Sequence, residues 1–315
     1  MHAAANNLRG GGVSPRGTLL RGQGIIEYVL IIAIIGLVIV FAGPGVAGAI
    51  RNQFNLVGNT LNSGTNGTAG GGGATGGGSA GTDSAVVQAA VAKDAGDWTL
   101  DEQKAVAEDI AAKGEASPAY AKAKAAMDAG RGWLVKLTNG ETAIYNIIGI
   151  NHDDAANGNG KAGLTFKFKW YSFGYTRMNA TATNIGGWEK SELRERLNSG
   201  DLWALLPTEF AGKIKPVTKM TDNQGGGKVG APTATTDKVF LLSSTEIYGN
   251  DGSDGTQYEY YAENGVPNMT TWTRSVYIAK DDSDRYPGFK YCSGDQLSAY
   301  TAEYDGVPLY ASFCF

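Results

Sequence analysis

The chain has 315 residues, with 27 basic and 31 acidic side chains and a formal net charge of −4 at pH 7. This balance gives no basic surface for nucleic acid, and no nucleic-acid partner is expected. The length leaves room for one or two domains with a sizeable core.

The N-terminus carries a targeting pattern. Residues 1–22 contain Arg9, Arg16 and Arg21 but no acid, and a run of apolar residues over 25–42 follows, interrupted by one charge, Glu27. A helix of this length crosses most of a ~30 Å hydrocarbon core, and arginines on its N-terminal side hold that end in the cytoplasm. An ordinary signal peptide is disfavoured, because the run is too long and no small-x-small cleavage site follows closely.

An ordinary membrane anchor is the second alternative, and the carboxylate argues against it. A charge at the centre of an apolar helix costs about 2.5–3.5 kcal/mol, and less near its end, so Glu27 needs a partner. Residues 21–28 (Arg-Gly-Gln-Gly-Ile-Ile-Glu-Tyr) resemble the processing site of tight-adherence (Tad, type IVb, Flp-like) prepilins. The resemblance covers about residues 21–45.

The prepilin resemblance implies particular roles for four residues. A prepilin peptidase would cut after Gly22 and make Gln23 the new N-terminus, which puts Glu27 fifth in the mature chain, followed by Tyr28. Glu27 would then pair with the α-amine of a neighbouring subunit during self-association into a filament. The major pilins of that family are much shorter than this chain.

Composition and pattern divide the chain into five predicted parts. These are a leader (1–22), a pilin helix and membrane anchor (23–61), a flexible linker rich in Gly, Ser and Thr (62–83), a helical segment (84–132) and a globular domain (133–315). By random-coil scaling the linker spans on the order of 25 Å.

Local signals predict an α+β fold with much irregular loop for the region after the linker. Thr99 and Glu102 form a capping box, and a second helix is expected from Ser117-Pro118 to just before Gly130. Asn139-Gly140 predicts a hairpin between strands over 134–137 and 144–150. Alternation over 164–170 predicts a half-exposed strand, and a helix is expected over 189–198.

A second resemblance covers about residue 133 to the end. His152-Asp153-Asp154, the residues 160–166, Gly186-Gly187-Trp188 and the closing residues 306–315 resemble an uncharacterised bacterial surface-domain family that we associate with C-type lectin and sulfatase-modifying folds. The resemblance implies a loop-rich, lectin-like α+β domain. It brings no biochemical activity with it.

One loop supplies candidate metal ligands. His152 is the only histidine outside the leader, which excludes a zinc site built on histidines. Asp153, Asp154, Asn157 and Asn159 offer hard oxygens and are the calcium candidates. The alternative is a polar loop whose side chains bond its own backbone. No other cofactor is expected.

Cys292 and Cys314 are the only cysteines. In an exported protein the first expectation is a disulfide, which here would close a loop of about 22 residues and stabilise by roughly 3 kcal/mol. Sulfatase-modifying oxidases use a cysteine pair, but these two lack the electropositive setting of a reactive thiol. A disulfide is therefore predicted, and no catalytic residue is assigned.

Aromatic residues are dense in the last third of the chain. Tyr258, Tyr260, Tyr261 and Trp272 lie among polar and acidic residues, and exposed aromatic rings in such a setting bind sugars or proteins. These four are the candidate ligand-binding residues. The alternative is that the rings fill the core of a loop-rich domain.

The sequence thus predicts a pilin-class subunit, not an enzyme. It would be inserted in the cytoplasmic membrane as a prepilin and then displayed on an extracellular pilus, where it binds a glycan or a surface protein. A non-adhesive coat subunit and a membrane-tethered enzyme of the sulfatase-modifying fold are the alternatives.

Overall fold

A computed structural model describes residues 84–169, 173–278 and 287–315. The chain divides into two compact units, Met1–Gly78 and Ser79–Phe315, and every described residue belongs to the second. The predicted leader, pilin helix and linker lie outside the described residues, as do Gly22, Gln23, Glu27 and Tyr28.

The predicted fold class requires a correction. Of the described helices, none is long and apolar enough to cross a membrane. The longest of them, α3 (Leu100–Lys113), has 14 residues and several charged side chains, whereas a membrane span needs about 20 apolar residues. The described residues form an α+β domain with several sheets, and the long hydrophobic helix of the predicted fold class is not among their helices.

Three α-helices open the domain: α2 (Ala85–Val91), α3 and α4 (Tyr120–Asp128). The predicted capping box is confirmed, because the Thr99 hydroxyl accepts from the Glu102 amide and the Glu102 carboxylate accepts from the Thr99 amide at 2.7 Å. The second predicted helix begins a few residues later than expected, at Tyr120. Short 3-10 turns separate the helices, η1 (Ala95–Asp97) and η2 (Gly114–Ala116).

The main sheet has five antiparallel strands in the order β1-β2-β4-β13-β8. Their bounds are β1 (Gly132–Lys136), β2 (Thr142–Ile150), β4 (Leu164–Lys169), β8 (Val239–Phe240) and β13 (Ser312–Cys314). The predicted hairpin is confirmed: β1 and β2 pair around a turn in which Gly140 takes φ +89°, a left-handed conformation that glycine adopts without strain.

Strand β4 is buried on both faces, so the prediction of a half-exposed strand is wrong. Its polar positions Thr165 and Lys167 are as buried as its apolar ones. The reason is tertiary. On one face Thr165 bonds the buried Asp153 carboxylate, and Lys167 contacts the sulfur of Met269. On the other face Phe166 packs among the core rings, and α3 approaches the residue before the strand. A Cβ on Gly163 would lie only 1.7 Å from the carbonyl oxygen of Ala107 on α3, so only glycine permits this approach.

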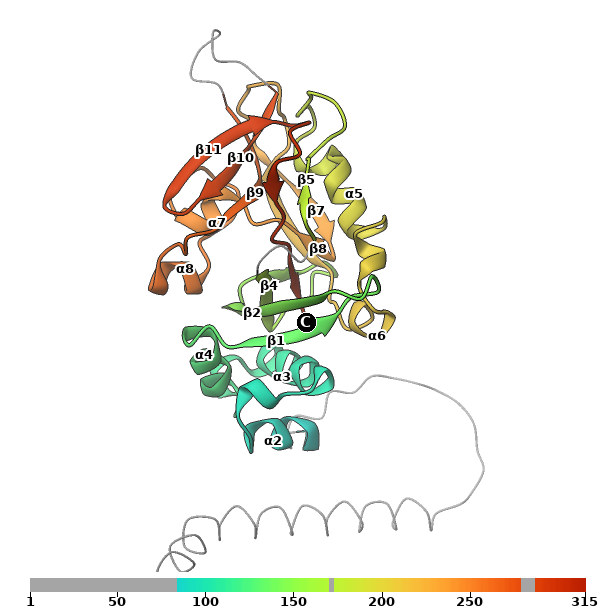
Figure 1. The fold of residues 1–315 in the computed structure, drawn as a ribbon. Helices are drawn as coiled ribbons and strands as arrows, with labels where there is room; N and C mark the ends of the chain where they lie inside the picture. Colours follow the sequence, from blue (N-terminus) through green and yellow to red (C-terminus); the bar gives the residue numbers. More distant parts are fainter. Residues whose placement is uncertain (1–83, 170–172, 279–286) are drawn as a thin grey trace, which may run out of the picture. The chain divides into compact units, whose positions relative to one another are not determined.

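Smaller sheets and short helices complete the domain (Figure 1). One sheet pairs β3 (Asp154–Ala155), β6 (Val217–Asp222) and β7 (Pro232–Asp237), and another pairs β9 (Thr270–Val276), β10 (Gly288–Ser293) and β11 (Gln296–Thr301). A two-stranded ladder joins β5 (Tyr175–Thr176) to β12 (Val307–Pro308). The remaining helices are η3 (Trp188–Lys190), α5 (Glu192–Asn198), η4 (Trp203–Leu205), α6 (Thr208–Ala211), α7 (Ser244–Tyr248) and α8 (Glu259–Asn264).

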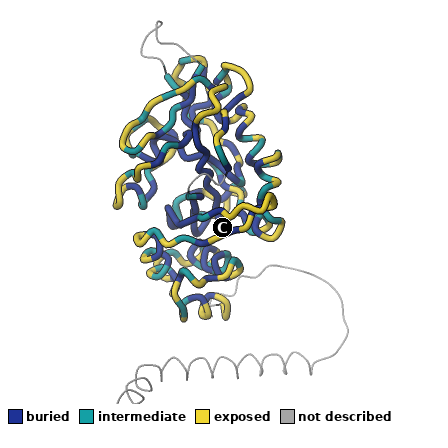
Figure 2. The backbone as a smooth tube through the Cα atoms, in the orientation of Figure 1, coloured by how far each residue is buried: buried dark blue, intermediate teal, exposed yellow. Residues whose placement is uncertain are grey.

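A single hydrophobic core joins the helical segment to the sheets. Buried side chains run through the middle of the domain from α2 to the C-terminus (Figure 2). At its centre Phe166 and Phe313 stack at 5.3 Å, with Tyr145 edge-on to both. The C-terminal Phe315 packs against the same rings, so the end of the chain is part of the core.

Candidate binding surface

The structure contradicts the predicted ligand-binding role of most of the four aromatic residues. Tyr258, Tyr261 and Trp272 are fully buried, and Tyr260 is half-buried against the core. Tyr258 caps the start of α8 and Tyr261 lies on its inner face, whereas Glu263 and Asn264 at the end of the helix are exposed. The polar residues therefore mark the outer side of a short helix, and they do not mark an exposed aromatic loop.

Three other tyrosines form an exposed stack on the β10–β11 hairpin. The rings of Tyr291 and Tyr300 lie 4.6 Å apart and nearly parallel, at 10°. The ring of Tyr304 lies 4.2 Å from that of Tyr300, at 32°. Tyr300 and Tyr304 are 38% and 40% exposed. We call these three residues the tyrosine stack.

The register of the hairpin explains the stack. Tyr291 pairs with Ser298 and Tyr300 pairs with Phe289, so the two tyrosines are diagonal neighbours on one face, within reach of each other's rings. A Cβ on Gly306 would lie 2.4 Å from the Tyr304 hydroxyl. Glycine at that position is therefore what lets the Tyr304 ring fold back towards Tyr300.

Trp272 lies beside the tyrosine stack, because it pairs with Tyr291 across β9 and β10. Its indole Nε1 donates to the backbone carbonyl of Thr176 at 2.7 Å, and its ring meets Tyr291 edge-on at 6.3 Å. One buried side chain on β9 thus links the stack to β5. Trp272 acts here as an internal brace and has no exposed face for a ligand.

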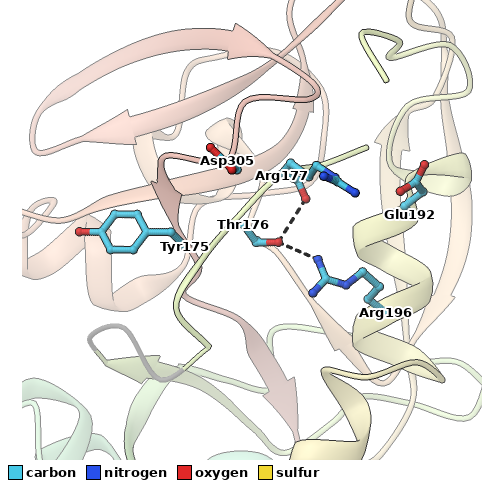
Figure 3. Close-up of a pocket in the computed structure, with 6 residues that line it drawn as sticks. All are labelled: Tyr175, Thr176, Arg177, Glu192, Arg196 and Asp305. Carbon is cyan, nitrogen blue, oxygen red and sulfur yellow. Dashed lines mark hydrogen bonds between the residues drawn. The ribbon is translucent and has the colours of Figure 1, made fainter. Parts of the chain in front are cut away.

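A pocket of about 290 Å³ opens at β5 and the start of α5. Six residues line it: Tyr175, Thr176, Arg177, Glu192, Arg196 and Asp305. In Figure 3 Arg177, Glu192 and Arg196 lie on one side of β5, while the ring of Tyr175 points away from them. Because Asp305 follows Tyr304 directly in the chain, the pocket and the tyrosine stack are neighbours. Tyr175 adds a further aromatic ring that is 60% exposed.

Arg196 is held in place on one side of the pocket. Its Nε and Nη2 each donate to the Asp201 carboxylate at 2.9 Å, and its Nη1 donates to the Thr176 hydroxyl at 2.7 Å. The hydrogen bonds with Asp201 raise the pKa of Arg196, and the same bonds lower the pKa of Asp201. The guanidinium is a fixed donor that shapes the pocket wall.

The other charged residues of the pocket are exposed and mixed in sign. Arg177, Glu192 and Asp305 are all exposed, so two cationic and two anionic side chains border one small space. Such a set offers both donors and acceptors to a ligand rich in hydroxyl groups. Together with the rings of the tyrosine stack, it forms a surface with flat apolar faces and a polar border.

The candidate calcium loop is satisfied by internal contacts. The Asp153 carboxylate is buried and accepts from Lys219 at 2.6 Å and from the Thr165 hydroxyl at 2.6 Å, while Asp154 pairs with Lys161 at 2.7 Å. The Asn157 side chain accepts from the backbone amide of Asn159. Within the described residues, no group of three or more His, Cys, Asp or Glu side chains is placed to hold a metal ion.

Asp153 belongs instead to a buried network of four charges. Lys219 contacts Asp153 at 2.6 Å and Glu246 at 2.5 Å, and Arg274 donates to both oxygens of Glu246. Burial opposes the ionisation of Asp153, but the Lys219 ammonium outweighs it and holds the pKa of the carboxyl well below its usual range. The network contains two cations and two anions and is therefore neutral as a whole.

The two cysteines are separate free thiols in the structure, so the predicted disulfide is not formed. Cys292 lies on β10 and Cys314 on β13, in different sheets. Burial raises the pKa of the Cys292 thiol to about 11, and it raises that of Cys314 as well. A buried thiol with a raised pKa lacks the thiolate character that catalysis needs.

Sequence reasoning missed the residues that form this surface. The alternation along β11, where Gln296, Ser298 and Tyr300 are more exposed than the residues between them, is a two-residue period that marks Tyr300 as outward-facing. The pocket had no such signal, because Tyr175 and Asp305 are 130 residues apart in the chain and meet only through the pairing of β5 with β12.

Comparison with known proteins yields one match. Residues 166–301 match a family described as a domain of unknown function (DUF6273). No curated protein and no solved structure matches the chain. The matched segment contains Tyr291, Tyr300 and five residues of the pocket, but it brings no activity or ligand with it.

Proposed function

We propose that this chain is an adhesive subunit of a Tad-like filament, whose globular domain binds a glycan or a surface protein through the tyrosine stack and the adjoining pocket. The observation that carries the proposal is the stack of Tyr291, Tyr300 and Tyr304 on the surface of the domain. The filament part rests on the sequence of residues 21–28.

Exposed, ordered aromatic rings support a binding role. Rings are normally buried, and an exposed cluster with a polar border usually marks an interaction site. Tyrosine gives a large, rigid contact area at small entropic cost, and its hydroxyl bonds polar groups at the edge of the contact. A sugar ring, with an apolar face and hydroxyls around it, fits a flat ring bordered by Arg177 and Asp305.

A glycan and matrix-protein array probed with the full chain tests the proposal. Truncating a central anchor typically costs 2 kcal/mol or more of binding, so Tyr300→Ala should weaken binding about thirtyfold or more. Leu134→Ala is the matched control, because Leu134 is 68% exposed but lies on β1. If no array component binds, or if both variants bind like the wild type, the non-adhesive coat subunit becomes the better interpretation.

A further inference from the structure

The centre of the buried network brings an amine and a carboxyl group into reacting distance. Lys219 Nζ lies 2.6 Å from Asp153 Oδ1 and 2.5 Å from Glu246 Oε1. The three side chains are at most 3% exposed. An amine, an acceptor carboxyl and a second carboxylate within hydrogen-bond distance of the amine are the groups that amide formation requires.

We propose that Lys219 and Asp153 become joined by an intramolecular isopeptide bond, with Glu246 as the proton carrier. Nothing else is consumed in this reaction, because an ammonium and a carboxylate give an amide and one molecule of water. The bond would tie β6 to the loop that follows β2.

The contacts assign a role to each group in the reaction. Lys219 Nζ first passes a proton to Asp153 Oδ1 along their 2.6 Å contact, which gives a neutral amine and a neutral carboxyl group. The freed lone pair of Nζ then attacks Cγ of Asp153. Negative charge then builds on Oδ2, which accepts from the Thr165 hydroxyl at 2.6 Å and the Tyr258 hydroxyl at 2.8 Å. These two donors stabilise the tetrahedral intermediate as an oxyanion hole does.

The intermediate collapses with loss of water. Glu246 takes a second proton from the nitrogen and passes it to Oδ1, which already carries the first. The bond between Cγ and Oδ1 then breaks, and Oδ1 leaves as water. Glu246 returns to its carboxylate form, and Oδ2 becomes the amide oxygen. It still accepts hydrogen bonds from the Thr165 and Tyr258 hydroxyls, so the carbonyl group of the product is hydrogen-bonded.

Burial favours the amide over the ion pair. Replacing a buried ion pair by well-packed hydrophobic residues is often neutral or stabilising, because the desolvation cost of the charges disappears, and amide formation removes the same two charges. Holding the reacting atoms in contact also removes most of the entropic barrier. The remaining charges, Glu246 and Arg274, stay paired with each other, so the product contains no orphaned ion.

Two carboxylates hold Lys219 as an ammonium, so the reaction starts from the protonated amine. Bond formation is therefore slow and takes place after the domain has folded. Burial opposes that charge, but Asp153 and Glu246 outweigh it and raise the pKa of Lys219. The bond would close a loop whose ends are 66 residues apart in the chain. Because both cysteines are free thiols, this bond would cross-link a domain in which the predicted disulfide does not form.

The test is mass spectrometry of the full chain, held folded for a week and then denatured and digested. The expected product is a branched peptide that contains residues 153 and 219 and is lighter than the two separate peptides by one water molecule. If the wild-type protein yields residues 153 and 219 only in separate linear peptides, the proposal is wrong. This result needs no variant and so does not depend on whether one folds.

Variants then assign the roles. Lys219→Arg keeps the charge but offers no lysine amine, and should yield linear peptides only. Glu246→Gln, if folded, should form the branched peptide at least tenfold more slowly; an unchanged rate would refute the proton-carrier role. Lys161→Arg is the matched control, because Lys161 pairs with exposed Asp154 and has no buried second carboxylate beside it. It should leave the branched peptide intact.

Discussion

Removing the Trp272 side chain should strongly destabilise the domain that carries the binding surface. Truncation of a buried tryptophan to alanine costs about 3–5 kcal/mol, and the ring of Trp272 is almost entirely buried. The backbone carbonyl of Thr176 also loses the indole donor at 2.7 Å, and an unsatisfied buried group costs about 1–3 kcal/mol. These terms overlap, so we expect Trp272→Ala to lower the free energy of unfolding by about 4–6 kcal/mol.

The assay is thermal and urea unfolding followed by circular dichroism. In a domain of this size each kcal/mol moves Tm by about 2–4 °C, so Trp272→Ala should melt roughly 10–20 °C below the wild type. Trp272→Phe keeps most of the ring but loses the indole N–H, and should cost about 1–3 kcal/mol. Tyr300→Ala removes a partly exposed ring and should change stability by less than about 1 kcal/mol.

The contrast between the two positions decides the argument. Trp272→Ala should lose binding because the support of Tyr291 is gone, whereas Tyr300→Ala should lose binding with its Tm nearly unchanged. If Trp272→Ala instead keeps its Tm and loses only binding, then Trp272 is an exposed anchor and the brace described here is wrong.

Three further outcomes follow from other residues. Burial lowers the pKa of Lys167 to about 8, so the folded state binds this proton less readily than the unfolded chain. The free energy of unfolding therefore rises with pH between about 8 and 10.5. Lys167→Met should stabilise the protein by about 3 kcal/mol at pH 7, and this gain should shrink in urea titrations at higher pH. Cys292 and Cys314 should resist alkylation in the native protein but both react in urea without reductant, and a cross-linked peptide on non-reducing mapping would contradict this. The mature N-terminus found by mass spectrometry should follow Gly22, and Glu27→Ala should impair incorporation into filaments; an intact leader or normal filaments would refute the prepilin hypothesis.

Local signals predicted local structure well. The capping box at Thr99 and the turn at Asn139-Gly140 depend on residues within a few positions of each other, and both are found as expected. The helix expected over 189–198 is present as α5, which begins at Glu192 after a Ser191 cap and buries Leu193 and Leu197. Interactions of this range depend only on neighbouring residues, so predicting them requires no knowledge of the tertiary fold.

Burial was less predictable, because it depends on what packs on each face. The alternating pattern of β4 predicted a half-exposed strand, but Met269 and Tyr310, far along the chain, cover the face that carries Lys167. The candidate calcium loop failed in the same way. Asp153 forms an ion pair with Lys219, which lies 66 residues further along the chain. No pattern in the neighbouring residues indicates that partner.

Strand β9 connects the binding surface to the buried network. Trp272 and Arg274 are two residues apart on this strand, and both are fully buried. Trp272 holds β5 and the tyrosine stack, while Arg274 bonds Glu246, which contacts Lys219. If the tyrosine stack binds a ligand as proposed, a pull on the β10–β11 hairpin would pass along β9 to the charge network, and from Asp153 through the Thr165 hydroxyl to β4 in the main sheet. The proposed covalent bond between Lys219 and Asp153 would lie on that path and would add a link that cannot dissociate.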